Sequence, residues 1–385
     1  MDFSFTPEEL AFRQEVRAFV REELRERPGG GLEAWQFDRG FIKKLAAKGW
    51  QTLAWPKEYG GQGAGHIKQL VYNEEIAYQD APATDLGSDR VGPTIILYGT
   101  EEQKARFLPS IVSGDAVWCQ GFSEPEAGSD LASLQTRAVE DGDTFVINGS
   151  KIWTSFAHLA QSMILLARTD PDAPKHKGIS YFLVDMKTPG ITIQPLVDLS
   201  GRHTFNQVFF DNVRIPRDSL LGEINRGWYV AAATLDFERS GIQRVIGSMR
   251  TYEQLVGYAR ETRQNGNPLL AQPLVRNKLA DLKIEFEVGR LLSYRVAWMQ
   301  SKGQIPNYEA SVSKLYGSEL AQRLAGAGVR ILGMGGQLAP GSPWAPLKGR
   351  FENLYLAAAG LTVAAGTSEI QRNIIAGRGL GLPRD

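Results

Sequence analysis

The spacing of apolar residues changes twice along this chain of 385 residues. From the start to about residue 115, apolar side chains recur at intervals of three and four, as they do on one face of a helix. From 116 to 225 the interval becomes two, which is typical of short strands, and the helical interval then returns. We therefore predict an α+β fold with an N-terminal helical domain (1–115), a central β-barrel-like or sandwich domain (116–225) and a C-terminal four-helix bundle (226–385).

Local signals place individual elements within this pattern. Thr6 and Glu9 have the spacing of a capping box, with Pro7 at the first helical position, so a helix is predicted to begin there. Strands are predicted at 144–147, 179–184 and 207–210, with turns at Asp141-Gly142, Asn148-Gly149 and Pro189-Gly190. Other helices are predicted at 41–48, 69–78, 93–98, 101–112, 227–264, 272–302, 307–332 and 350–376.

Composition gives no support for a nucleic-acid or membrane-surface partner, because 43 basic residues balance 43 acidic ones. The longest weakly polar run, 354–366, is shorter than the ~20 residues of a membrane-spanning helix. The first residues also lack the apolar core of a signal peptide. We therefore expect a cytoplasmic protein whose partners are small molecules or other subunits.

The single cysteine, Cys119, excludes an intramolecular disulfide and fits a reducing compartment. It follows a tryptophan in an apolar strand with no histidine nearby, which favours a structural residue over a nucleophile. The four histidines are scattered along the chain, and no metal site is expected.

A segment rich in short side chains follows this predicted strand. Gly121, Gly128 and Ser129 leave backbone N–H groups open to a pyrophosphate. Phe122 and Ser123 offer an apolar contact and a hydroxyl for the edge of a ring. The segment is suited to a dinucleotide, although an ordinary surface turn has a similar composition.

A second segment lies about 20 residues further along the chain. Asn148-Gly149 predicts a hairpin turn that leads into a strand. Trp153 and Ser155 would then lie on one face of that strand, where an indole and a hydroxyl point the same way. Together, the two segments could stack on an isoalloxazine ring and hydrogen-bond to it.

These two segments resemble the two signatures of the acyl-CoA dehydrogenase family. Further segments that resemble the family, in the same order, are 55–61, 205–216 and 365–376. The resemblance implies helical, β and helical domains, bound FAD, and α,β-dehydrogenation of an acyl-CoA thioester to the 2-enoyl-CoA, as in β-oxidation of lipids. In that reaction a glutamate removes the α proton and flavin N5 accepts the β hydride. Electrons would pass to an electron-transferring flavoprotein.

The resemblance also implies where the base lies. The position that many members use, just before the Gly-Thr of the last motif, is Ala365, which cannot take a proton. Other members use the glutamate of a Leu-x-x-Glu-Arg stretch, which matches Glu238 here. Glu238 is therefore the expected base, with Glu369 as the alternative. Without the resemblance, Glu238 would be interpreted as a surface carboxylate paired with Arg239.

The remaining site residues are implied by the same resemblance. The cofactor contacts are expected at Phe122, Ser123, Gly128, Ser129, Trp153, Thr154, Ser155, Thr367 and Glu369, and the thioester or CoA contacts at Ser129, Asp236, Arg239 and Gly366. Arg239 could instead be a salt-bridge partner within the bundle.

The resemblance also has implications for how subunits assemble. Homotetrameric members place an arginine and a phenylalanine of an Arg-x-x-Phe-Gly stretch against the FAD of a neighbouring subunit. The matching positions here are Thr262 and Asn265, with Arg263 one residue beyond the arginine position. A threonine cannot replace a bidentate cation. We therefore expect a tetramer of α2β2 type, in which a homologous second chain supplies the missing cation. The alternative function is that of a non-catalytic or co-catalytic subunit.

Overall fold

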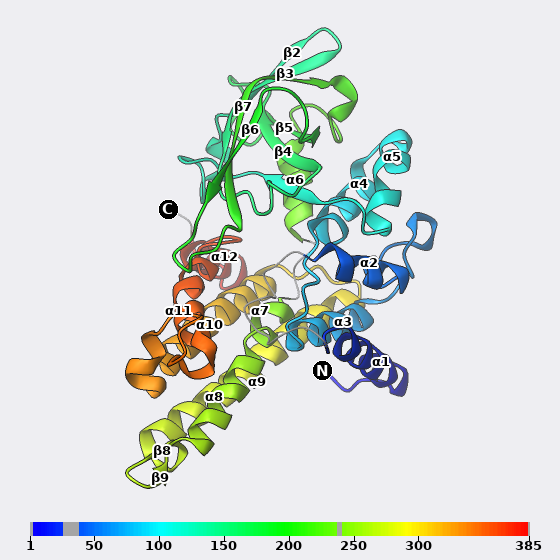
Figure 1. Cartoon of the computed structure of the whole chain (residues 1–385). Coiled ribbons are helices and arrows are strands. Elements are labelled where there is room, and N and C mark those ends of the chain that lie inside the picture. The colour runs from blue at the N-terminus through cyan, green and yellow to red at the C-terminus, as the bar shows by residue number, and fades with distance from the viewer. Residues whose placement is uncertain (1–2, 26–37, 237–240, 384–385) are drawn as a thin grey trace. The chain divides into compact units, whose positions relative to one another are not determined.

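The structure is a computed structural model that describes residues 3–25, 38–236 and 241–383 (Figure 1). Helices precede and follow a central region of strands, so the predicted α+β class is confirmed. The chain divides into two compact units. The first unit comprises Met1–Gln36, Gly65–Ala81 and Arg239–Asp385, and the second comprises Phe37–Ala64 and Pro82–Glu238.

The first unit is largely helical. Its elements are α1 (Pro7–Glu23), α3 (His66–Tyr78), α7 (Ile242–Ile246), α8 (Met249–Glu261), β8 (Arg263–Gln264), β9 (Asn267–Pro268), α9 (Pro273–Ser301), α10 (Tyr308–Leu332), α11 (Arg350–Leu361) and α12 (Ser368–Ile374). The predicted capping box is confirmed, since the Glu9 backbone N–H donates to Thr6 Oγ1 and the Thr6 N–H donates to the Glu9 carboxylate. Residues of α3, α7, α8, α9, α10 and α11 share one apolar core.

Two neighbouring carboxylates, Glu74 and Glu75, are buried on α3. Arg17 of α1 holds Glu75 through two hydrogen bonds of 2.9 and 2.7 Å. Arg13 pairs with Glu74, and the hydroxyl of Tyr294 on α9 donates to Glu74 Oε2 over 2.7 Å. A buried carboxylate is tolerated only when it is paired in this way. The cluster therefore joins three helices that lie far apart in sequence.

The described residues of the second unit form one sheet and four α-helices. Its elements are α2 (Arg39–Ala47), a π-helix (Gly87–Val91), α4 (Gly92–Tyr98), α5 (Glu101–Val112), β1 (Trp118–Gly121), β2 (Arg137–Asp141), β3 (Thr144–Lys151), β4 (Ser162–Arg168), β5 (Ile179–Asp185), β6 (Ile191–Leu196), β7 (Phe205–Pro216) and α6 (Gly227–Asp236). The strand order is β1-β4-β2-β3-β7-β6, and β5 pairs with β4.

Both faces of β4 and β5 are buried, because alternate side chains enter two different cores. Ile164 and Tyr181 belong to a core shared with α4, α5 and α6. Leu165 and Phe182 belong to the core on the other face, with residues of β1, β3 and β7. The buried Cys119 belongs to this second core, as expected for a structural cysteine.

Asn148-Gly149 is not the predicted turn. Both residues lie inside β3, where the register with β7 shifts between Ile147 and Gly149. Gly149 has φ 144°, and a Cβ added there would lie 2.6 Å from Thr136 Oγ1. The dipeptide therefore forms a bulge that requires glycine. The turn between β2 and β3 lies at Gly142, with φ 60°.

Two of the long helices predicted in the C-terminal region are interrupted. In the range 227–264 the described residues form α6, α7 and α8, and Gly241 has φ 67° just before α7. The range 350–376 is divided between α11 and α12, because Ala365 and Gly366 have φ 54° and 84°. Residues with a left-handed backbone end a helix. The spacing of apolar residues does not predict where they lie.

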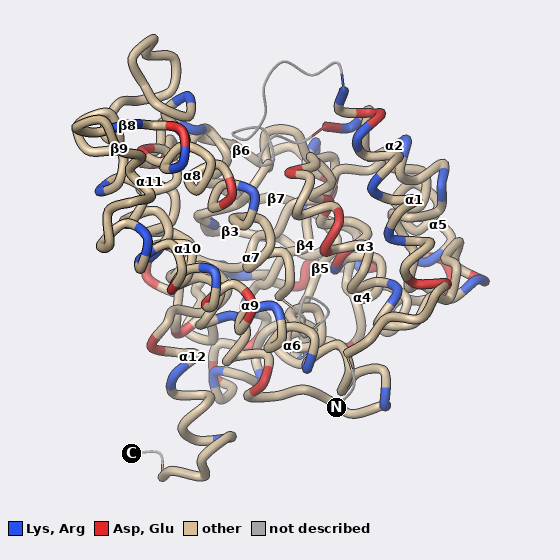
Figure 2. Tube along the Cα trace, turned by 90° about the horizontal axis from the view of Figure 1, so that it is seen from below, with Lys and Arg blue, Asp and Glu red and all other residues tan. Residues whose placement is uncertain are grey.

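Acidic and basic residues are interspersed along the trace, in keeping with the balanced composition (Figure 2). Among the described residues, no helix combines the length and the apolar character needed to cross a bilayer.

Candidate functional site

The structure brings the two predicted cofactor segments together in the second unit. The Ile152 backbone N–H donates to the Ser123 carbonyl over 2.9 Å. Lys151 Nζ, at the end of β3, donates to the Phe122 carbonyl over 3.0 Å and lies 2.7 Å from Glu124 Oε1. Three hydrogen bonds thus connect residues 122–124 to residues 151–152.

The ion pair between Lys151 and Glu124 is buried, with side-chain exposures of 0% and 8%. Glu124 also accepts the backbone N–H groups of Gln135, over 2.6 Å, and Thr136, over 2.9 Å. Burial lowers the pKa of Lys151 to about 8. Burial opposes ionisation of Glu124 as well, but the Lys151 ammonium and the two N–H donors together hold the pKa of that carboxyl below its usual value. Both groups are therefore charged at neutral pH.

The strand predicted to carry Trp153 and Ser155 ends earlier, at Lys151. Trp153 has φ 59° and Phe156 has φ 57°, both in the left-handed region. Such a conformation costs about 1–2 kcal/mol for a residue with a side chain. The indole of Trp153 is 59% exposed, with its edge against the ring of Phe205 at 5.9 Å between centroids. The prediction that Trp153 and Ser155 lie on one face of a strand is therefore wrong. The indole of Trp153 is nevertheless exposed.

Hydrogen bonds to β7 and the residues before it hold the 152–156 segment in this shape. The Thr154 N–H donates to the Asn206 carbonyl, and the Asn206 side-chain amide donates to the Thr154 carbonyl, both over 3.0 Å. The Phe156 N–H donates to the Thr204 carbonyl over 2.9 Å. The Thr154 hydroxyl is buried and has no hydrogen-bond partner among the described residues.

The loop after β1 contains the remaining predicted residues of this unit. Phe122 is buried, and its ring packs edge-on against Tyr181 at 5.9 Å. Ser123 is half-buried, whereas Gly128 and Ser129 are exposed. No atom lies within 4 Å of a Cβ added to Gly128, so the backbone of the loop is open on that side.

Gly366, Thr367 and Glu369 lie in the first unit, just before and at the start of α12. Lys314 Nζ donates to the Gly366 carbonyl over 2.7 Å. The Thr367 hydroxyl accepts the N–H three residues further on and so caps α12. Glu369 is exposed, 3.8 Å from Arg372 Nη1. Hydrogen bonds from its own backbone N–H and from Thr367 lower the pKa of Glu369.

The expected base lies outside the described residues. Asp236 is the last residue of α6, and Glu238 and Arg239 follow it in the undescribed stretch 237–240. Ala365, at the alternative position of the base, has a left-handed backbone, and its carbonyl accepts the Gln371 side-chain amide over 3.0 Å.

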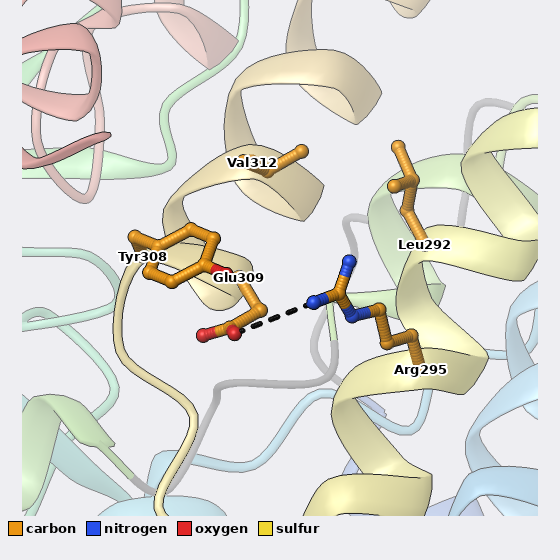
Figure 3. A pocket seen from close by; sticks show the side chains of 5 residues that line it. All are labelled: Leu292, Arg295, Tyr308, Glu309 and Val312. Carbon is orange, nitrogen blue, oxygen red and sulfur yellow. Dashed lines mark ion pairs between the residues drawn. The ribbon is translucent and has the colours of Figure 1, made fainter. Parts of the chain in front are cut away.

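Two cavities, one in each unit, are small. One cavity, of about 30 Å³, lies between α9 and α10, where Arg295 and Glu309 point toward one another at 3.6 Å beside Leu292, Tyr308 and Val312 (Figure 3). The other cavity, of about 190 Å³, lies beside α5 and the adjoining ends of β4, β5 and β7. Sites for drug-sized ligands usually enclose about 300–1,000 Å³, so neither cavity could hold a dinucleotide. Among the described residues, no group of three or more His, Cys, Asp or Glu side chains could hold a metal ion.

Sequence reasoning missed several residues around the joined segments. Lys151 and Glu124 connect them, Asn206 holds Thr154 of the second segment, and His158 and His203 contact Asn206. Asn206 lies within a segment that resembles the family, and its alternation with Phe205 predicts an inward side chain. A lysine at the end of a strand gives no comparable signal, because such residues are usually exposed.

Comparison with known proteins identifies the class. Models of the acyl-CoA dehydrogenase N-terminal, middle and C-terminal domains match residues 6–115, 119–213 and 225–380. The chain therefore belongs to the acyl-CoA dehydrogenase family and is an oxidoreductase. It is 38% identical to the acyl-CoA dehydrogenase IpdE1 of Mycobacterium tuberculosis, over 97% of this chain and 98% of that protein.

Solved structures give the same result. The chain resembles a chain of the Tcur3481-Tcur3483 steroid ACAD, with a TM-score of 0.90, 38% identity and full coverage of both chains. It also resembles a chain of the ChsE4-ChsE5 complex from Mycobacterium tuberculosis, with a TM-score of 0.89, 36% identity and again full coverage of both.

The family implies a flavin cofactor, and residues of the second unit fit one. An exposed indole can stack on an aromatic ring. A buried hydroxyl without a partner, that of Thr154, lies next to it in sequence. The open backbone at Gly128 leaves room for a phosphate.

Proposed function

We propose that this chain catalyses the FAD-dependent α,β-dehydrogenation of an acyl-CoA thioester to the 2-enoyl-CoA. The observation that carries the proposal is the exposed indole of Trp153. The backbone of this residue is left-handed, and the next residue, Thr154, has a buried hydroxyl without a partner among the described residues. When bound, FAD supplies the acceptor for the hydride that leaves the β carbon.

The chain's own residues hold the cofactor and the thioester. Trp153 stacks against the flavin ring, while Thr154 and Ser155 offer hydroxyls to its edge. Ser123 and the backbone of Gly128 and Ser129 bind the ring edge and the pyrophosphate. Phe122, Thr367 and Glu369 are further proposed contacts of the cofactor, and Ser129, Asp236, Arg239 and Gly366 are the proposed contacts of the thioester or CoA.

Glu238 is the proposed base. A carboxylate that removes an α proton is most effective when its pKa lies near the working pH. Glu369 is exposed beside Arg372, and its pKa is lowered, which makes it a weaker base. Ala365 cannot take a proton, so Glu238 is the remaining candidate that the family pattern offers.

We propose a bulky, ring-bearing acyl group as the substrate. The support is the name of one similar structure, a steroid ACAD, at 38% identity over the whole chain. A pocket must match the polar and apolar groups of the ring system that it binds. The relative activity toward different acyl groups therefore tests the proposed substrate class. The proposed electron acceptor is an electron-transferring flavoprotein, and the proposed location is the cytoplasm.

We also propose a mixed assembly with a homologous second chain. Two similar structures carry the names of two different chains each. Thr262 and Asn265 replace the arginine and phenylalanine expected at the hairpin of β8 and β9. Arg263 Nη1 donates to the Gly266 carbonyl over 3.0 Å, within the same hairpin. One of its donors is thereby used within the hairpin, which supports a partner that supplies another cation.

Flavin reduction by substrate tests the activity. The protein, with its partner where one is needed, is mixed with straight, branched, dicarboxylic and ring-bearing acyl-CoAs while flavin absorbance is recorded. We expect bleaching with a ring-bearing substrate. Glu238→Gln should retain FAD but slow bleaching by about 10²–10⁴-fold, because only the basic lone pair is lost. The matched control is Glu369→Gln, and loss of bleaching in that variant alone would move the role of base to Glu369.

Mass and FAD content test the assembly. The chain is expressed alone and together with a homologous chain from the same genome. We expect the chain alone to be unstable or poor in flavin, and the pair to form a tetramer. A stable homotetramer with one FAD per chain would rule out the mixed assembly.

A further inference from the structure

Two histidines stack beside the segment proposed to hold the flavin. His158 follows the 152–156 segment, and His203 precedes β7. Their ring centroids lie 4.1 Å apart with 24° between the planes. Both rings are exposed, whereas Asn206, which both contact, is fully buried. The pair therefore exchanges protons with solvent while it contacts a buried amide.

The contacts of Asn206 assign a proton arrangement to the pair. Asn206 Oδ1 lies 2.8 Å from His203 Nε2, so His203 donates from that nitrogen. Asn206 Nδ2 donates one hydrogen to the Thr154 carbonyl over 3.0 Å. Its second hydrogen points to His158 Nδ1 over 3.1 Å. This distance is shorter than the 3.3 Å between the same nitrogen and Asn206 Oδ1, so we assign His158 Nδ1 as an acceptor without a proton. Every hydrogen-bonding group of the amide is then used.

The same amide holds the flavin-facing backbone. Thr154 and Asn206 exchange two hydrogen bonds, one through the backbone N–H of Thr154 and one through its carbonyl. Phe205, directly before Asn206, packs against the indole of Trp153. Trp153 has a left-handed backbone that its surroundings must maintain.

We infer that His158, His203 and Asn206 form a positioning group for Trp153 and Thr154, and that protonation of His158 loosens the flavin-facing segment. This inference rests on the proposed function as to the ligand, but the coupling between the histidines and Trp153 is a property of the chain alone. A proton on His158 Nδ1 would face the Asn206 N–H group, donor against donor. The second amide hydrogen then loses its acceptor, and His158 Nδ1 can donate only to Asn206 Oδ1, 3.3 Å away, so the amide that holds Thr154 must rearrange.

The electrostatic surroundings favour the neutral pair. Burial and then the adjacent His203 ring lower the pKa of His158. The charged side chains of the preceding loop are Asp198 and Arg202, and Asp198 Oδ1 accepts the hydroxyl and N–H of Ser200 and the Arg202 N–H. Two stacked imidazolium rings would repel, so one proton on the pair opposes a second.

The direction of the pH effect follows. At pH 8, well above its lowered pKa, His158 is neutral and the network is complete. As the pH falls below the ordinary histidine value of about 6.5 toward the lower pKa of His158, protonation begins to break the network. Loss of one hydrogen bond of this kind weakens FAD binding by about fivefold, since such a bond contributes on the order of 1 kcal/mol.

The test follows Trp153 directly. The full-length protein is labelled with 5-fluorotryptophan, and the fluorine resonance of Trp153, one of 8 tryptophans, is assigned by its absence in Trp153→Phe. Without FAD, we expect this resonance to shift between pH 8 and 5 with a midpoint below 6.5. His158→Gln should remove the shift, and His203→Gln should raise its midpoint. His66→Gln, at the start of α3 in the other unit, is the matched control and should leave the titration unchanged.

A second measurement records the dissociation constant of FAD at pH 8 and pH 5.5. We expect the wild type to bind more weakly at pH 5.5, by up to about fivefold, and His158→Gln to bind alike at both. A Trp153 resonance that does not move with pH in the wild type would overturn the inference, whether or not FAD binds. Failure to bind FAD at either pH, with a Trp153 resonance that titrates, would instead count against the proposed function alone.

Discussion

Replacing Lys151 with methionine tests whether the buried ion pair stabilises the joined segments. Methionine keeps most of the apolar stem but removes the ammonium that contacts Glu124 and the Phe122 carbonyl. Breaking a buried pair from one side costs about 3–5 kcal/mol, because the remaining charge stays buried. Glu124 keeps two backbone N–H donors, from Gln135 and Thr136, so we expect a loss near the lower end, about 3 kcal/mol.

The loss should be measurable by calorimetry. In a unit of this size, 1 kcal/mol corresponds to about 2–4 °C in Tm, which gives a decrease of about 6–12 °C for Lys151→Met. Protein and FAD concentrations must be held equal across variants, because ligand binding and association also shift Tm. Adding Glu124→Gln should restore part of the loss, since the second substitution removes the stranded charge.

Lys175→Met is the matched control. Lys175 contacts both oxygens of Asp130 at 2.9 Å, but the side chains are 53% and 59% exposed. An exposed pair contributes about 0–1 kcal/mol, so Tm should fall by no more than about 4 °C. If Lys151→Met lowered Tm by no more than this control, the reasoning from burial would be refuted.

Two further predictions concern Gly149 and Cys119. Gly149→Ala should lower the free energy of unfolding by about 2–3 kcal/mol, because the new methyl meets Thr136 at 2.6 Å. Gly142→Ala, with open space around it, should lower it by about 1 kcal/mol in the same measurement. Equal losses would contradict the bulge assignment. Burial raises the pKa of the Cys119 thiol far above its usual value, so it should stay protonated at pH 9 and react with a thiol reagent only after unfolding; rapid reaction of the native protein would contradict its burial.

The parts of the fold that local chemistry determines were predictable. The helices expected at 101–112, 272–302 and 307–332 are confirmed to within one residue at each end. α5 begins at a capping box formed by Thr100 and Gln103, which fixes its first residue. Such signals lie within a few residues of the element that they define, so one sequence is enough to find them.

The parts that depend on distant contacts were not predictable. Asn148-Gly149 has the composition of a turn, but Thr136 on β2 and the pairing with β7 make it a bulge. The left-handed backbone of Trp153 depends in the same way on Asn206, 53 residues later in the numbering. The sequence predicted which two segments make the candidate site. It did not predict the side chains that hold them together, because their partners are far apart along the chain.

The divided path of the first unit bears on how the protein is synthesised. Leu70 of α3 belongs to a core whose other buried members lie between residues 242 and 351. About 195 residues separate the end of α3, at 78, from the start of α9, at 273. At about 5–20 residues per second, a ribosome needs roughly 10–40 s to add them. By the end of that interval the second unit, which ends at Glu238, has been synthesised in full, while α3 still lacks the core partners that follow it in the sequence. We therefore expect chaperones to bind the nascent chain mainly at its N-terminal helices.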